Sequence, residues 1–136
     1  LALGARHTID STDGDEIRKH INSFDLIIST VAVDLDWPEY VTTLKPKGRL
    51  HFVGIPTQPI ALGVVSLLRG QKSVSASPVG SPATIARMLE FAALHGIKPD
   101  VEEYGIDELN NAIERLRSGA PRYRVVINMS RGRSTP

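Results

Sequence analysis

Short apolar runs alternate with amphipathic stretches along most of this chain. The continuous run Asp25–Val31 holds several β-branched residues, which is typical of a strand buried on both faces of a parallel sheet. Shorter runs predict further strands at His7–Asp10, Arg49–Gly54, Ser73–Ala76, Val101–Tyr104 and Arg124–Met129. Strands that alternate with helices predict an α/β fold with a parallel sheet.

Residues that start and stop helices stand between these runs. Asp36 and Ser81 are each followed closely by a proline, so both are expected to cap a helix whose first turn tolerates proline. The other signals are a polar helix over Asp13–Ile21, a stop with a turn at Lys45–Gly48, a short helix at Val64–Leu68, a helix end at Gly96 and a helix cap at Asp107.

The pattern shows no internal repeat and no linker, so we expect one domain over residues 1–129 and a disordered tail at 130–136. Leu1–Ala5 resembles the last turn of a helix that Gly4 ends, which indicates that the chain starts inside a fold. The histidines His7, His20, His51 and His95 are too scattered to predict a metal site, and His51 is interpreted as a satisfied sheet residue.

Composition narrows the class of protein. With 41% hydrophobic and 23% charged residues, the chain is typical of a soluble globular protein. A net charge of +1 favours neither nucleic acid nor an anionic membrane as a partner, and no apolar run reaches the roughly 20 residues of a membrane span. The absence of cysteine excludes disulfides and cysteine-ligated metals within the chain and agrees with a cytoplasmic location.

Candidate binding residues follow three of the predicted strands. In an open α/β sheet, ligands bind beyond the carboxyl ends of the strands. Those places are Thr30–Ala32, Val53–Pro56, whose Gly54 would let a flat ligand approach the backbone, and Ser77–Ser81, which lies beside a helix start. The alternative is that all three are ordinary turns between strands and helices, where Gly, Pro and Ser are common anyway.

Six segments, taken in order, resemble the medium-chain, zinc-type alcohol dehydrogenases of the cinnamyl alcohol dehydrogenase group. They are Leu3–Ala5, Asp25–Val31, Leu44–Gly48, Phe52–Pro56, His95–Asp100 and Arg122–Val126. The resemblance implies a partial Rossmann-type, doubly wound parallel sheet that lacks its first two strands, and NADP or NAD as the cofactor. It implies that Thr30 and Val31 line the nucleotide, that Val53, Gly54 and Ile55 lie against the nicotinamide, and that Ser77 and Val79 present backbone groups to its carboxamide. Arg124, and less directly Arg122, is implied as a contact of the cofactor phosphate.

Two features of that family are not found in this sequence. Its G-x-G-x-x-G turn has no counterpart here, and its catalytic zinc ligands belong to a preceding domain, so zinc is implied for the parent enzyme only. The resemblance therefore implies a cofactor-domain fragment of an NAD(P)-dependent alcohol dehydrogenase that is inactive alone. The alternative is a non-enzymatic α/β module that binds nucleotides or self-associates.

The expected strand order leaves an edge open. In the 3-2-1-4-5-6 sheet, His7–Asp10 would be strand three and Asp25–Val31 strand four, with a gap of about 14 Å where strands one and two belong. The exposed edge of Asp25–Val31, or that of Ser73–Ala76, would then pair with a second copy. We therefore expect a homodimer through one of these two edges, or a rearranged sheet.

Overall fold

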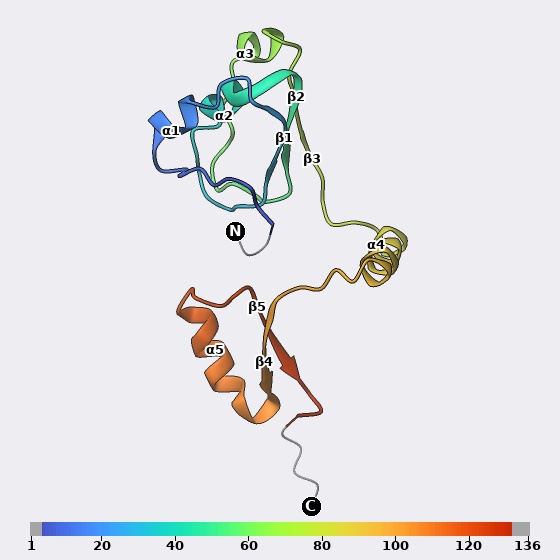
Figure 1. The fold of residues 1–136 in the computed structure, drawn as a ribbon. Coiled ribbons are helices and arrows are strands. Elements are labelled where there is room, and N and C mark those ends of the chain that lie inside the picture. The colour runs from blue at the N-terminus through green and yellow to red at the C-terminus, as the bar shows by residue number, and fades with distance from the viewer. Residues whose placement is uncertain (1–3, 132–136) are drawn as a thin grey trace, which may run out of the picture. The chain divides into compact units, whose positions relative to one another are not determined.

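The computed structural model describes residues 4–131, which divide between two compact units, residues 1–79 and 80–136 (Figure 1). Both units are built from helices and parallel strands, which confirms the α/β fold with parallel sheets. Residues 1–3 of the expected helix end and residues 132–136 of the expected tail lie outside the described residues. The domain bounds of 1–129 stay a prediction.

The first unit holds a three-stranded parallel sheet in the order β1-β2-β3. The strands are β1 (Phe24–Ser29), β2 (Leu44–Phe52) and β3 (Ser73–Ala76). Their register places Ile28 beside His51 and His51 beside Ser75. All three strands were predicted at these places, so the apolar runs located the sheet correctly.

The turn predicted at Lys45–Gly48 lies inside β2 and does not precede it. Leu44 already pairs with Phe24, and the register then shifts so that Leu26 pairs with Arg49. Lys47 takes a left-handed backbone with φ of 63°, and its N–H donates to the carbonyl of Gly70 at 2.6 Å. The turn is thus absorbed as an irregularity of the ladder, because strand pairing continues on both sides of it.

The strand predicted at His7–Asp10 is wrong. These residues are not part of either sheet, and β1 pairs with β2 alone among the described strands. Instead of entering a ladder, Asp10 uses its carboxylate to accept hydrogen bonds from the backbone and hydroxyl of Thr12, at 2.8 and 2.6 Å. The segment is an extended lead into the first helix, since no neighbouring strand is there to pair with it.

The polar helix is shorter than the predicted span of Asp13–Ile21. Helix α1 covers only Gly14–Arg18, and Asp13 caps it by accepting from the N–H groups of Asp15 and Glu16. The chain then turns away at Asn22, whose φ is 53° and whose N–H donates to the carbonyl of Thr42. This contact with the next helix replaces the last predicted turn of α1.

Helix α2 (Trp37–Thr43) covers one face of the sheet and supplies the core. Its predicted cap Asp36 accepts from the N–H of Glu39 at 3.1 Å. The buried core comprises Trp37, Val41, Leu44, Leu50 and Phe52. The Trp37 ring meets Phe52 edge to face with centroids 4.7 Å apart, so Trp37 is a packing residue of this core.

The opposite face of this sheet is open within the first unit. Figure 1 shows α1 and α2 together on one side of the sheet. On the other side, Leu26 and Ile28 of β1 are 53% and 55% exposed. The expectation that the Asp25–Val31 run is buried on both faces is therefore not met inside this unit, because its helices lie on one side only. Helix α3 (Val64–Leu68) leads to Gly70, as predicted.

The second unit consists of α4 (Pro82–Leu94), β4 (Val101–Gly105), the 3-10 turn η1 (Ile106–Glu108), α5 (Leu109–Arg117) and β5 (Arg124–Asn128). Strands β4 and β5 pair in parallel. Ser81 caps α4 as predicted, and Gly96 follows its end with φ of 64°. The cap predicted at Asp107 is wrong: a 3-10 turn precedes α5, and the carboxylate of Glu108 accepts from the N–H of Gly105.

One carboxylate joins three segments of the second unit. Glu102 on β4 accepts two hydrogen bonds from the guanidinium of Arg115 on α5, at 2.6 and 2.7 Å. It also accepts from the backbone N–H of Arg122, just before β5, at 2.9 Å. These donors, the Arg115 side chain first, lower the pKa of Glu102 from 4.5 to about 2.

The stability of the second unit should therefore fall in acid. Because the folded pKa of Glu102 lies below its ordinary value, its contribution is complete above pH 4.5 and is lost as the pH falls toward about 2. We expect Glu102→Gln to lower the unfolding free energy at pH 7 and to flatten its decline between pH 4.5 and 2. Urea unfolding followed across this pH range measures both effects. Glu114→Gln, at an exposed position of α5, is the matched control, and an equal flattening there would contradict the assignment.

Candidate functional site

The turns after β2 and β3 enclose a hollow of about 510 Å³ in the first unit. It brings together five of the residues predicted from the sequence, namely Val53, Gly54, Ile55, Ser77 and Val79, together with Phe52, Ala76 and Pro78. The hollow lies at the carboxyl ends of parallel strands, because both turns follow strands that point the same way. Its lining is mainly apolar, and Val79 is 91% exposed at its rim.

Gly54 fixes the distance between two neighbouring turns. The N–H groups of Val53 and Gly54 both donate to the carbonyl of Ser29, at 2.9 and 3.0 Å. A Cβ on Gly54 would lie only 2.7 Å from the carbonyl carbon of Thr30 and would also collide with the carbonyl oxygen of Val31. The glycine is therefore required by the backbone of Thr30–Val31, which packs directly behind the hollow. This contact accounts for the glycine without a ligand, so the expectation that Gly54 admits a flat ligand stays a prediction.

Asp34, which the sequence analysis did not single out, ties the same two turns together. Its carboxylate accepts from the hydroxyl of Thr57 at 2.5 Å and from the N–H of Gln58 at 3.0 Å. The Thr57 hydroxyl, followed by the Gln58 amide, lowers the pKa of Asp34 below the usual aspartate value. The segment after β1 is thus held against the segment after β2, close to Gly54.

Replacing Asp34 with alanine should loosen this link without unfolding the unit. We expect amide exchange at Gln58 to rise about five- to tenfold, the equivalent of losing one solvent-exposed hydrogen bond. In the wild type, the same loosening is expected as the pH falls through the lowered pKa of Asp34. Asp25→Ala serves as the control, because the exposed ion pair of Asp25 with Lys45 should contribute little. Unchanged exchange at Gln58 in Asp34→Ala would contradict the role of Asp34.

Ser77 lines the hollow and has two polar groups that a ligand could bind. Its backbone N–H already donates to the carbonyl of Phe52 at 3.1 Å, so its carbonyl and hydroxyl are the groups that a ligand could bind. The hydroxyl lies 2.9 Å from Nε2 of His51, and Nδ1 of the same ring lies 2.8 Å from the hydroxyl of Ser75. His51 is thereby confirmed as a sheet residue whose two ring nitrogens are both hydrogen-bonded.

Arg124 belongs to the second unit. It is the first residue of β5, paired in register with Val101, and its side chain is exposed. Arg122 lies just before β5 and donates its backbone N–H to Glu102. The structure thus gathers five of the predicted residues of the first unit around one hollow. Thr30 and Val31 do not line this hollow, and their role at the nucleotide, like that of Arg124 at the phosphate, stays a prediction.

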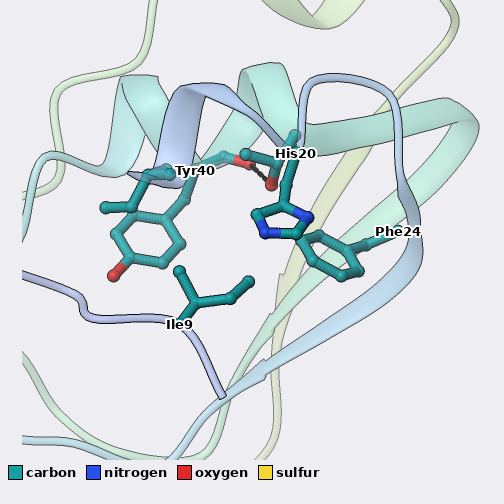
Figure 2. A pocket seen from close by; sticks show the side chains of 6 residues that line it. Ile9, His20, Phe24 and Tyr40 are labelled. Carbon is teal, nitrogen blue, oxygen red and sulfur yellow. Dashed lines mark hydrogen bonds between the residues drawn. The ribbon is translucent and has the colours of Figure 1, made fainter. Parts of the chain in front are cut away.

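A second, smaller hollow lies between α1, α2 and the segment that contains Ile9 (Figure 2). Its volume is about 70 Å³, and Figure 2 shows the rings of His20, Phe24 and Tyr40 around Ile9. The His20 ring stacks on Phe24 with centroids 5.7 Å apart, and burial raises the pKa of Tyr40. This space is small and almost wholly lined by hydrocarbon, so it is a packing gap that lacks the converging polar groups of a ligand site.

Between residues 4 and 131, no group of three or more His, Asp or Glu side chains has a geometry suited to a metal ion. No helix in the described part of the chain is long and apolar enough to cross a membrane.

Comparison with known proteins places these observations in a context. Residues 1–93 match the family described as zinc-binding dehydrogenase. The chain is 53% identical over 131 residues to the aldehyde reductase AdhA of Synechocystis sp., covering 96% of this chain and 39% of that protein. A cinnamyl alcohol dehydrogenase from Sorghum bicolor superposes with a TM-score of 0.85 at 34% identity, covering 99% of this chain and 38% of that one.

A further solved relative carries a cofactor. It is a CAD from Helicobacter pylori complexed with NADP(H), with a TM-score of 0.65 and 29% identity, and the match covers 79% of this chain and 32% of that one. This chain therefore spans less than two-fifths of the length of each of these relatives.

Proposed function

Because the chain belongs to the zinc-binding dehydrogenase family and matches its cofactor-binding part, we propose that it holds the nicotinamide end of NADP or NAD in an alcohol or aldehyde oxidoreductase. The observation that carries the proposal is the hollow of about 510 Å³ lined by Val53, Gly54, Ile55, Ser77 and Val79. Its position beyond the carboxyl ends of parallel strands is where open α/β sheets bind their ligands.

The chemistry of the hollow suits a nicotinamide. Apolar side chains of Val53, Ile55 and Val79 can cover a flat ring, while the Ser77 carbonyl and hydroxyl can bind a carboxamide. The dinucleotide supplies hydride transfer, and in the parent enzyme zinc supplies polarisation of the substrate oxygen. The chain's own contribution is to orient the ring and to exclude water from one of its faces. NADP is the favoured form, since a solved relative is complexed with NADP(H).

We propose further that the 136-residue chain alone binds this cofactor weakly and does not turn over alcohols or aldehydes. It has no cysteine for a zinc site and no G-x-G-x-x-G turn that would seat the pyrophosphate on a helix N-terminus. The chain can therefore bind the nicotinamide end of the cofactor, but it lacks the groups that would bind the negatively charged pyrophosphate. Sub-micromolar affinity for NADP, or zinc-dependent turnover by this chain, would contradict the proposal.

Nicotinamide mononucleotide is the probe that tests the site itself. Added to the 15N-labelled chain, it should shift the amide signals of Val53–Ile55 and Ser77–Val79. Adenosine 2′,5′-bisphosphate, which lacks the nicotinamide, is the matched control and should leave these signals unmoved. Shifts caused equally by both compounds, or by neither, would overturn the assignment of the hollow to nicotinamide.

A second candidate function is self-association, and the open sheet edges favour it. Among the described strands, β1 pairs only with β2, and β3 also pairs only with β2, so both outer edges are free in the first unit. We propose that a homodimer forms through one of these edges, as unpaired edges invite strand addition. Light scattering that shows a monomer at micromolar concentration would overturn the dimer.

We also propose a cytoplasmic location, since a chain without cysteine suits a reducing compartment.

A further inference from the structure

His51 lies directly behind the candidate nicotinamide site, on the sheet face that no helix of the first unit covers. Its neighbours in β2, Leu50 and Phe52, point into the core, whereas the half-buried His51 points the other way. Its ring runs along β3: Nδ1 reaches the hydroxyl of its paired residue Ser75 at 2.8 Å, and Nε2 reaches the hydroxyl of Ser77 at 2.9 Å. The imidazole of His51 thus links β2 both to Ser75 of β3 and to Ser77, which is one of the residues that line the hollow.

The position of the proton on His51 determines whether the Ser77 hydroxyl donates or accepts in this hydrogen bond. A neutral imidazole has one donor nitrogen and one acceptor nitrogen, and a serine hydroxyl has a single hydrogen to give. If Nε2 carries the proton, it donates to Ser77, and the hydrogen of that hydroxyl is free for a ligand's carbonyl oxygen. If Nδ1 carries the proton, Ser77 must donate to Nε2, and its hydroxyl can only accept from a ligand's N–H. The imidazolium, with both nitrogens protonated, also frees the Ser77 hydrogen.

The nitrogen of His51 that carries the proton is determined by its hydrogen bonds to Ser75 and Ser77. Register places Ile28 of β1 beside it, on the face that it shares with Leu26. The charged side chain on the same face of β2 is Arg49, two residues earlier, whose Nε lies 3.5 Å from the hydroxyl of Ser73. The ring nitrogens of His51 therefore face hydroxyl groups, which can donate or accept with equal ease.

We propose that His51 is a positioning residue for the nicotinamide site: it holds the Ser77 hydroxyl, and the nitrogen that carries its proton sets whether that hydroxyl donates or accepts toward a bound carboxamide. The inference rests on the proposed function, because it takes the nicotinamide carboxamide as the group that forms a hydrogen bond with the Ser77 hydroxyl. His51 itself does not line the hollow, so it acts through Ser77.

Two substitutions separate the two halves of the contact. A glutamine amide reaches about as far as Nε2, whereas the shorter asparagine amide reaches only the place of Nδ1. His51→Gln should therefore keep the bond to Ser77, and His51→Asn should keep only the bond to Ser75. We expect the Kd for nicotinamide mononucleotide to rise about fivefold in His51→Asn and in Ser77→Ala, as for the loss of one hydrogen bond, and to stay within about twofold in His51→Gln. Ser73→Ala, on the same face of β3, is the control and should bind as the wild type does.

A ligand-free spectrum tests the positioning role independently. In 15N-resolved spectra of the histidine rings, which distinguish the tautomers, Ser77→Ala should move the Nε2 signal of His51 and Ser75→Ala the Nδ1 signal. Equal binding by His51→Asn and His51→Gln, or an Nε2 signal that ignores Ser77→Ala, would overturn the inference. If nicotinamide mononucleotide shifts no signal of the wild-type hollow, the proposed function fails, and the ring spectra alone then decide whether His51 holds Ser77.

Discussion

Gly54→Ala is expected to destabilise the first unit by about 1–3 kcal/mol, as overpacking at a close backbone contact does. The added Cβ would stand 2.7 Å from the Thr30 carbonyl carbon, and both partners in this contact are backbone, so no side chain can rotate aside. Restricting the unfolded chain by replacing glycine returns only about 0.4–1 kcal/mol, which is too little to offset the collision. The net sign is therefore destabilising.

The same substitution should also disturb the hollow. To relieve the collision, the Thr30–Val31 turn or the Val53–Ile55 turn must move, and the bonds of Val53 and Gly54 to the Ser29 carbonyl then lengthen. Urea unfolding gives the change in stability, and amide exchange at Val53 and Gly54 shows where the strain falls.

Gly63→Ala is the matched control for Gly54→Ala. Gly63 has an extended backbone with φ of −70°, neither glycine takes a left-handed φ, and a Cβ on Gly63 would meet no atom of the described residues within 4 Å. We expect Gly63→Ala to be neutral or slightly stabilising. If both variants lost the same stability, the loss would come from the backbone preference of glycine, and the close contact with Thr30–Val31 would not be its cause.

Trp37→Ala is expected to cost the first unit about 3–5 kcal/mol, enough to unfold much of a unit of this size. Trp37 is only 5% exposed, and its ring packs edge to face on Phe52 and next to Tyr40. Phe52 is the last residue of β2 and part of the hollow's lining, so the loss of its support also reaches the candidate site.

Trp37→Phe separates packing from the identity of the ring. Phenylalanine retains an aromatic contact with Phe52 but leaves a smaller gap, so it should cost clearly less than alanine. Thermal unfolding followed by far-ultraviolet circular dichroism compares the variants, since tryptophan fluorescence is lost in both. An alanine variant as stable as the wild type would show that the α2 core does not hold the sheet together.

The sequence predicted correctly those features of the helices and strands that depend only on residues close together in the chain. Asp36 and Ser81, each with a nearby proline, marked the starts of α2 and α4, because a cap needs only the next three residues. The failures are non-local. His7–Asp10 has the composition of a strand but no partner to pair with, and the Lys45–Gly48 turn is absorbed because the ladder resumes after it.

The candidate site shows the same division. The rule that ligands bind after parallel strands was enough to locate Val53–Ile55 and Ser77–Val79, which the structure brings to one hollow. Asp34 and His51 were not recognised as supports of this site, since their partners are more than 20 residues away in sequence. For His51, the strand register reveals the contact: once His51 is known to pair with Ser75, a contact with Ser77 just beyond it follows.

The parallel pairing has a kinetic consequence. Partners in the three parallel pairings are 20 to 24 residues apart, as for Phe24 with Leu44, Leu50 with Val74 and Glu103 with Val126. No pair of strands in the described part of the chain can therefore form its hydrogen bonds one after another from a tight turn, as the two strands of a hairpin do. Each pairing must wait until a loop of that length has closed, and the entropy of closure is lost before any ladder bond forms. Helix α2 and helix α5 lie inside two of these loops, so a helix that forms before the strands pair would shorten the loop that has to close.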